Sequence, residues 1–158
     1  MAYAIINIGS NLGNRRLNLS RAVRAISMAF GDFEASHTVE SKSWGYDSPN
    51  KFLNMALMVR TDLEPQKVLD TLLDIQDSIC ADAHRTDDGS YADRVIDIDL
   101  IAIDDVVMDT PPLTHPPPRM AERRFGLKPM AEIAGAWTHP LTGLSVMEML
   151  ANLPEDDE

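Results

Sequence analysis

The sequence predicts an α+β fold of the ferredoxin-like type: an antiparallel βαββαβ sandwich followed by a helical C-terminal addition. Two observations support this prediction. Apolar stretches typical of buried strands alternate with stretches of helical spacing in that order, and no internal repeat interrupts them. The chain also has 158 residues, the usual length of one domain, so we expect residues 1–158 to form a single domain.

The first half of the chain supplies a strand, a helix and a second strand. Residues 3–8 are apolar and run into a turn at residues 9–14, which predicts a buried strand. Leucine, valine and isoleucine then recur at helical spacing over residues 17–30, and Gly31 is expected to end that helix. Residues 33–43 are predicted to form the next strand.

The second half begins with an apolar strand predicted at residues 52–61. A helix is expected to open at Glu64-Pro65, because proline suits the first helical position. Residues 80–92 are polar and predict a loop, and residues 94–103 predict an apolar strand. The remaining expected features are a rigid extended connection through the proline cluster at 111–118 and short helices near 119–125 and 145–151.

Composition excludes several classes of protein. The net charge of −11 argues against a nucleic-acid surface, because such surfaces carry a basic stripe. No apolar run reaches the length of a membrane span, and the start of the chain lacks the pattern of a signal peptide. The single cysteine, Cys80, cannot form an internal disulfide and suits a reducing cytoplasm. We therefore expect a cytoplasmic monomer with no nucleic-acid or membrane partner.

The motif Asp97-Ile98-Asp99 is the clearest chemical signal in the sequence. Residues i and i+2 of a strand point to the same side, so the two carboxylates stand beside each other. Each carboxylate resists ionisation next to the other, and a divalent cation such as magnesium removes that cost. The alternative is a solvent-exposed strand face, but aspartate is a poor strand former. The motif therefore favours a magnesium site for phosphoryl transfer.

Three further residues are candidates for binding. Arg94 lies at the start of the same predicted strand, where a guanidinium can grip phosphate oxygens. Its alternative role is an ion pair with a neighbouring aspartate. Phe52 and Asn54 share one face of their strand and can stack on and pair with a heterocycle. On these two residues alone, a core phenylalanine and a capping asparagine remain the better interpretation.

Several motifs follow one another along the chain. They are Ile8-Gly9-Ser10-Asn11-Leu12-Gly13, Trp44-Gly45-Tyr46, Phe52-Leu53-Asn54, Asp93-Arg94-Val95-Ile96-Asp97-Ile98-Asp99-Leu100, Arg123-Arg124-Phe125, Pro129, Glu132-Ile133-Ala134 and His139-Pro140. In this order they together resemble one enzyme family, the 6-hydroxymethyl-7,8-dihydropterin pyrophosphokinases of folate biosynthesis. The resemblance covers nearly the whole sequence.

The resemblance implies a ferredoxin-like fold and a role for each matching residue. Asp97 and Asp99 match a pair that binds two magnesium ions. Phe52 and Phe125 match aromatics that sandwich the pterin, and Asn54 matches the amide that reads the pterin edge.

On the ATP side, the resemblance places Arg94 and Arg123 on the phosphates and Thr114 near the nucleotide. Trp44, within a family motif, is expected beside the pterin, with a core position as its alternative. Arg85 is expected to reach the triphosphate from a loop at residues 81–93 that closes as a lid over both substrates.

The family transfers the β,γ-pyrophosphoryl unit of ATP to the pterin alcohol and releases AMP. This sequence departs from the family pattern at Ala81, Asp93 and Pro117, which stand where the family has arginine, proline and histidine. His115 is expected to replace the missing histidine. Ser41-Lys42-Ser43 stands in place of the family's Thr-x-Pro.

These departures concern ATP handling and leave a second hypothesis open. The chain is then a catalytically weak or inactive relative that still binds the pterin. A third possibility, a ferredoxin-like regulatory domain, explains the fold but not the Asp97-Ile98-Asp99 motif.

Overall fold

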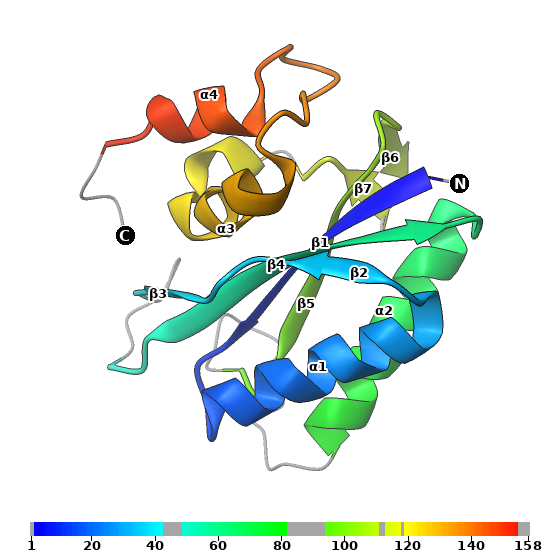
Figure 1. The fold of residues 1–158 in the computed structure, drawn as a ribbon, viewed down its shortest axis with the longest axis vertical. Helices are drawn as coiled ribbons and strands as arrows, with labels where there is room; N and C mark the ends of the chain where they lie inside the picture. Colours follow the sequence, from blue (N-terminus) through cyan, green and yellow to red (C-terminus); the bar gives the residue numbers. More distant parts are fainter. Residues whose placement is uncertain (1, 43–48, 82–93, 111–112, 118, 155–158) are drawn as a thin grey trace.

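The structure is a computed structural model that describes residues 2–42, 49–81, 94–110, 113–117 and 119–154 (Figure 1). It combines one larger sheet, a small hairpin and helices on both sides of the sheet. In chain order the elements are β1 (Ala2–Ser10), α1 (Arg15–Phe30), β2 (Phe33–Ala35), β3 (Val39–Ser41), β4 (Phe52–Thr61), α2 (Pro65–Ala81), β5 (Asp97–Ile103), β6 (Met108–Thr110), β7 (Leu113–His115), the 3₁₀ helix η1 (Met120–Glu122), α3 (Arg124–Ala134) and α4 (Val146–Ala151).

The larger sheet is antiparallel and has the strand order β2-β4-β1-β5, with β3 also pairing with β4. The two longest strands, β1 and β4, pair side by side along their full length in the centre. Along the chain, the sequence predicts the order βαββαβ with a helical C-terminal addition, and the structure follows it with the further strands β3, β6 and β7. The antiparallel sheet with its helices confirms the α+β class at that level.

The residues of β1 alternate between two apolar cores. Ala4, Ile6 and Ile8 are buried in a core with side chains of α1 and α2. Ile5 points to the other face, into a second core formed with α3 and α4. Figure 1 shows the sheet between these two pairs of helices. The C-terminal helical addition therefore covers the sheet face opposite α1 and α2.

Local capping interactions set both ends of helix α1. The side chain of Asn14 accepts a hydrogen bond from the backbone N–H of Leu17, which caps the first turn. Gly31 has a φ of 88°, a value that favours glycine, and its N–H bonds the carbonyl of Ser27. The expected end of the helix at Gly31 is thus confirmed.

The single strand predicted at residues 33–43 is wrong in one respect, because the structure divides it into β2 and β3. Ser36 lies between them and explains the division. Its backbone N–H bonds the carbonyl of Ala56, while its hydroxyl accepts the N–H of Ala56. The serine side chain therefore replaces a backbone partner, and the regular ladder stops there.

The C-terminal third differs more from the prediction. The proline cluster was expected to be only an extended connection, but β7 within it pairs back onto β6. The short helix expected near 119–125 is instead a 3₁₀ turn followed by α3, which runs on to Ala134 with Pro129 inside it. Burial of Leu127 and Met130 outweighs the poor helix propensity of Gly126 and Pro129.

No helix in the described part of the chain is long and apolar enough to span a membrane.

Candidate active site

Side chains from three neighbouring strands meet on the sheet face that packs against α3. The first row consists of Asn54 on β4, Gly9 on β1 and Asp97 on β5. The second row lies two residues away on each strand, later in the chain on β4 and β5 and earlier on β1. It consists of Ala56, Asn7 and Asp99. Because residues i and i+2 share a face, both rows point to the same side. We call these two rows the floor.

A cavity of about 160 Å³ lies over this part of the sheet, far more room than a single water needs. Phe52 at the start of β4 and Phe125 in the first turn of α3 line it, as do two arginines. Most of the residues that the sequence predicts for binding thus surround one cavity. They are Phe52, Asn54, Arg94, Asp97, Asp99, Arg123 and Phe125.

Gly9 has no side chain, so the middle of the first row is a gap that the side chains of Asn54 and Phe52 border; we call this gap the slot. A Cβ atom built at this position would lie 2.9 Å from Oδ1 of Asn54 and 3.4 Å from Cδ1 of Phe52. A side chain here would therefore collide with the amide and narrow the space beside the aromatic ring. The family motif at residues 8–13 thus gains a physical reason for its first glycine.

The amide of Asn54 is held in one orientation. This side chain is buried, and its Nδ2 atom donates to the carbonyl of Val39 at 3.1 Å and to the hydroxyl of Ser41 at 2.8 Å. Both amide hydrogens are therefore committed to β3, while Oδ1 faces Gly9. Ser41, one position where the chain departs from the family pattern, still supplies a hydroxyl for this purpose.

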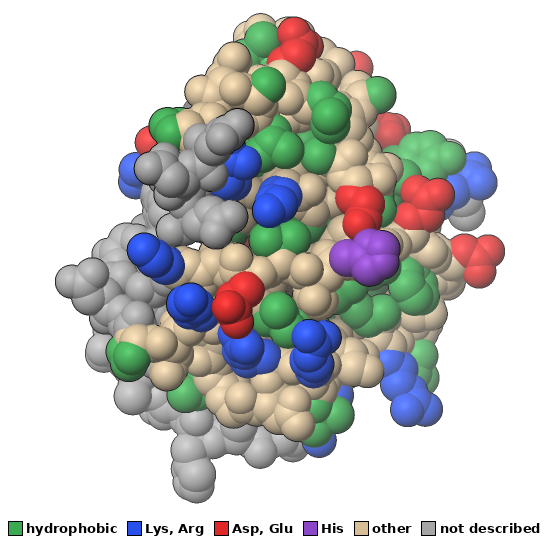
Figure 2. Space-filling model, turned by 60° about the vertical axis from the view of Figure 1, so that its left-hand side comes forward, with side chains coloured by type: hydrophobic (Ala, Val, Ile, Leu, Met, Phe, Trp, Pro, Cys, Tyr) green, Lys and Arg blue, Asp and Glu red, His purple; other side chains and the backbone are tan. Residues whose placement is uncertain are grey.

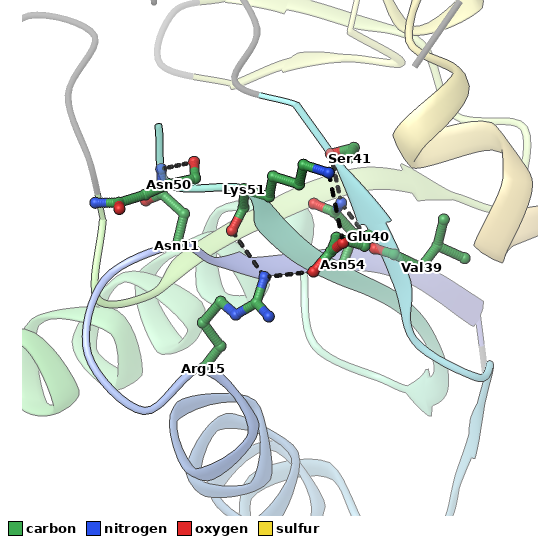
Figure 3. A network of polar contacts seen from close by, with 8 residues as sticks. All are labelled: Asn11, Arg15, Val39, Glu40, Ser41, Asn50, Lys51 and Asn54. Atoms are coloured by element: carbon green, nitrogen blue, oxygen red, sulfur yellow. Dashed lines mark hydrogen bonds and ion pairs between the residues drawn. The ribbon is translucent and has the colours of Figure 1, made fainter. Parts of the chain in front are cut away.

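A polar network ties the wall of the cavity to α1 (Figure 3). Nη1 of Arg15 donates to Glu40 at 3.0 Å and to the backbone carbonyl of Lys51 at 2.9 Å. These bonds join the start of α1 to β3 and to the turn before β4. The network therefore fixes the relative positions of the two strands that hold Asn54.

The turn after β1 holds Arg94 in place through Asn11. The backbone N–H of Asn11 donates to the carbonyl of Arg94 at 3.0 Å, and Oδ1 of Asn11 accepts the N–H of Arg94 at 2.6 Å. Nδ2 of Asn11 also donates to the carbonyl of Asn50. The predicted strand begins at Arg94, but β5 begins three residues later, at Asp97. Arg94 therefore lies just before the strand, and its exposed side chain lines the cavity.

Burial and mutual repulsion disturb the two carboxyl groups of the floor. Burial raises the pKa of Asp97, although the positive charges of Arg94 and Arg123 oppose the change. Burial and then the charge of Asp97 raise the pKa of Asp99 to about 7, again against the two arginines. The side chain of Asp99 is open to the cavity, so solvent moderates this effect.

Helix α2 supports the strand that carries this pair. Oε1 of Gln76 accepts a hydrogen bond from the backbone N–H of Ile98, between the two aspartates, at 2.8 Å. Ile98 itself is buried on the opposite face, in the core with α1 and α2. The backbone between the carboxylates is thus held by a hydrogen bond from Gln76 and by the packing of the Ile98 side chain in the core.

The carboxylate pair fits a magnesium ion. Two carboxylates with raised pKa values gain a partner when a cation binds between them. Magnesium commonly takes one or two protein carboxylates and completes its shell with water and substrate phosphates. Among the described residues no group of three or more metal-binding side chains occurs, so a magnesium ion here would depend on such outside ligands.

Arginine and lysine side chains gather on the face shown in Figure 2, although the chain as a whole carries a net charge of −11. Lys42, Arg94 and Arg123 line the cavity itself. Such a local excess of positive charge attracts anions.

The remaining predicted site residues are less well placed by the structure. Trp44 and Arg85 lie outside the described residues, as do Asp93 and almost all of the expected lid. Thr114 and His115 belong to β7, for which only the backbone is described. Among the positions that depart from the family pattern, Ala81 ends α2 and Pro117 is half-buried before η1.

Sequence reasoning missed three residues of the site. Asn7, at the centre of the second row, was passed over as part of an apolar strand, although a polar residue in such a strand was a visible signal. The sequence places Asn11 in a turn and in the family motif at residues 8–13, but it does not predict the bonds of Asn11 to Arg94. Gly126 closes over the floor from α3, where a Cβ would lie 2.7 Å from Nδ2 of Asn7. No local pattern reveals that contact.

Comparison with known proteins agrees with the resemblance. Residues 5–135 match the model of the 7,8-dihydro-6-hydroxymethylpterin-pyrophosphokinase (HPPK) family. A 2-amino-4-hydroxy-6-hydroxymethyldihydropteridine pyrophosphokinase of Porphyromonas gingivalis is 34% identical over 143 residues, covering 89% of this chain and 95% of the relative. The enzyme of the same name from Aquifex aeolicus is 32% identical over 142 residues, covering 89% of this chain and 86% of the relative.

Solved structures agree at the level of the fold. The wild-type HPPK-DHPS of Plasmodium falciparum superposes with a TM-score of 0.72 at 11% identity, over 95% of this chain and 44% of the solved chain. This chain thus spans less than half of that protein, and the likeness concerns the fold alone. Together with the family match and the relatives above, these findings mean that the chain belongs to the 7,8-dihydro-6-hydroxymethylpterin-pyrophosphokinase family.

Proposed function

We propose that this protein transfers the pyrophosphoryl group of ATP to 6-hydroxymethyl-7,8-dihydropterin and releases AMP, a step of folate biosynthesis. The observation that carries the proposal is the first row of the floor. The slot at Gly9 lies between an oriented amide, Asn54, and a carboxylate, Asp97, and Phe52 borders it. A flat heterocycle in that slot has one end read by the amide and its other end beside the carboxylates.

Two aromatic rings and one hydrogen-bond acceptor position the pterin in this proposal. Phe52 and Phe125 cover its two faces. Both hydrogens of the Asn54 amide are used within the protein, so Oδ1 accepts a hydrogen bond from an N–H of the pyrimidine edge. The hydroxymethyl group then points toward Asp97 and Asp99.

The charged residues of the cavity hold the phosphates. Arg94 and Arg123 contact the phosphate oxygens, and Asp97 and Asp99 would hold two magnesium ions. The ions, when bound, neutralise charge on the phosphates. A bond forms between the pterin alcohol oxygen and the β-phosphorus, and the bond from that phosphorus to the oxygen shared with the α-phosphate breaks. AMP leaves with that oxygen, and the alcohol proton passes to solvent.

The chain's own contribution is therefore positioning and charge, without a covalent intermediate. The described residues around the cavity include both the carboxylates and the arginines that turnover needs, which favours an active enzyme over an inactive pterin-binding relative. Trp44 and Arg85 are proposed to contact the pterin and the triphosphate, respectively. Thr114 and His115 are proposed to lie near the nucleotide.

Several broader features belong to the same proposal. The strand order β2-β4-β1-β5 supports a ferredoxin-like classification of the sheet. We propose a single domain, active as a monomer in the cytoplasm, whose partners are ATP and the pterin, with no nucleic acid or membrane.

The products of the reaction test this proposal. Purified protein is incubated with MgATP and 6-hydroxymethyl-7,8-dihydropterin, and the nucleotides are separated by chromatography. We expect AMP in equal amount to the pterin diphosphate. Formation of ADP in place of AMP would reject pyrophosphoryl transfer, and pterin binding without any product would favour the inactive relative.

A further inference from the structure

The side chain of Asn7 lies in the floor of the cavity and has one oxygen atom whose bonding needs an explanation. This residue lies in the middle of the second row and lines the cavity. Its Oδ1 atom is buried, and among the described residues it has no hydrogen-bond partner. By contrast, the buried amides of Asn18 and Asn54 both donate to neighbouring groups. A buried polar group without a partner requires an explanation.

The surroundings keep the Asn7 side chain in the cavity. Gly126 approaches so closely that a Cβ there would lie 2.7 Å from Nδ2 of Asn7. Because Gly126 follows Phe125, the amide of Asn7 lies near one of the two aromatic residues that line the cavity. Across the sheet, Asp99 is its direct neighbour on β5 and Ala56 its neighbour on β4. Ala56 has no polar side-chain group to offer, and Asp99 in its ionised form has no hydrogen to donate.

The spacing of the sheet places Asn7 along one side of the slot. Neighbouring strands are about 4.8 Å apart, so the row from Asn54 to Asp97 spans about 10 Å, close to the length of a two-ring heterocycle. Residues two apart on one strand are separated by about 6.8 Å. A ring lying over Gly9 along the first row therefore turns one long edge toward Asn7.

We propose that Asn7 is a further substrate-binding residue. Its side-chain amide hydrogen-bonds one long edge of the pterin ring system, between the end that contacts Asn54 and the end that carries the alcohol. This inference rests on the proposed function. One long edge of a 7,8-dihydropterin carries the 4-oxo group and N5, and the other carries N1 and the N8–H. An amide offers both a donor and an acceptor, so either edge supplies a partner that the protein itself does not provide.

Binding measurements separate this role from a structural one. The wild type, Asn7→Ala and Asn7→Ser are titrated by calorimetry with 6-hydroxymethyl-7,8-dihydropterin, in magnesium and α,β-methylene-ATP, an analogue that cannot release AMP. Asn152→Ala, at the exposed end of α4, is the matched control. Asn7→Ser keeps a polar group and provides a second variant if Asn7→Ala does not fold.

We expect Asn7→Ala to weaken pterin binding about three- to tenfold, the range of one hydrogen bond. Affinity for the ATP analogue should change less than twofold, and the melting temperature should not fall, because an unpartnered buried acceptor is removed. Unchanged pterin affinity would overturn the inference, as would equal loss for both ligands with a lower melting temperature. Absence of pterin binding to the wild type would instead reject the proposed function.

Discussion

At the residue scale, the carboxyl groups of Asp97 and Asp99 make the metal-free protein less stable than it would be without them. Burial raises the pKa values of both groups, and the charge of Asp97 adds to the rise at Asp99, whose pKa reaches about 7 against a usual value of 3.8. Between these two values the folded state binds more protons than the unfolded state. The contribution of Asp99 to stability therefore declines as the pH rises from about 4 to about 7.

Asp99→Asn tests this balance between function and stability. The substitution removes a proposed magnesium ligand, so pyrophosphoryl transfer should fall by at least about a hundredfold, a loss of about 2.7 kcal/mol in transition-state stabilisation. It also removes the repulsion, so the melting temperature in EDTA at pH 8 should hold or rise. The gain should be smaller at pH 5, where the wild-type group is already largely protonated. Thermal melts at both pH values measure this difference, and a clear loss of stability at pH 8 would mean that Asp99 has a structural role.

Phe125→Ala tests the proposed stacking of the pterin on Phe125. One stacking face of the pterin is lost while the arginines and carboxylates remain, so pterin affinity should fall more than ATP affinity. Stacking contributes about 0.5–1.5 kcal/mol beyond the buried area, which is roughly two- to twelvefold in affinity before the loss of area is added. Separate titrations with the two ligands provide the comparison. Equal weakening of both would identify Phe125 as a core residue.

At the scale of elements, β5 depends on α2 for its position. Among the strands that the structure describes, it lies at the edge of the sheet and pairs with β1 alone. Its outer side is held at Ile98 by Gln76, directly between the two aspartates. The distance between the carboxylates and the slot therefore depends on a side chain from the opposite face of the sheet.

Gln76→Leu should reveal this dependence. The backbone N–H of Ile98 loses its acceptor, which we expect to lower the free energy of unfolding by about 1–2 kcal/mol and to reduce the rate of AMP formation. Gln66→Leu on the same helix is the matched control, because within the described part of the chain Gln66 bonds the exposed Asp70 one turn away and nothing on β5. The control should lie within about 0.5 kcal/mol of the wild type. Similar effects of both substitutions would exclude a specific role for Gln76.

Most elements could be predicted because their signals are local. The apolar run of β4 and the proline at the start of α2 agree with the structure residue for residue. The division between β2 and β3 could not be predicted, because it depends on a bond between Ser36 and a distant residue, Ala56. Helix α3 was missed because tertiary burial outweighs its local propensities.

At the scale of the whole molecule, the site is assembled from segments far apart in the sequence. The sequence identifies the Asp97 and Asp99 pair, because two residues of one strand share a face whatever surrounds them. It does not show that Gly9 lies between Asn54 and Asp97, because that requires the register of three strands. The family resemblance supplied Phe125 and Arg123, for which spacing alone offers no argument.

One face of the sheet forms the larger apolar core, and the other face carries the floor of the cavity. The face toward α1 and α2 is apolar along β1, β4 and β5 and forms the larger core. The other face is apolar only where α3 and α4 pack, and it becomes polar at the end of β1 where the floor lies. Substitutions in the floor can therefore change binding while the larger core remains intact.

The most direct test of this account combines product analysis with the carboxylate pair. AMP and pterin diphosphate are measured over a magnesium titration for the wild type and for Asp97→Asn. We expect magnesium-dependent formation of AMP and pterin diphosphate in equal amounts by the wild type, and at least about a hundredfold less by the variant at saturating magnesium. Undiminished AMP formation by a folded Asp97→Asn variant, or a wild-type product other than AMP, would contradict the account.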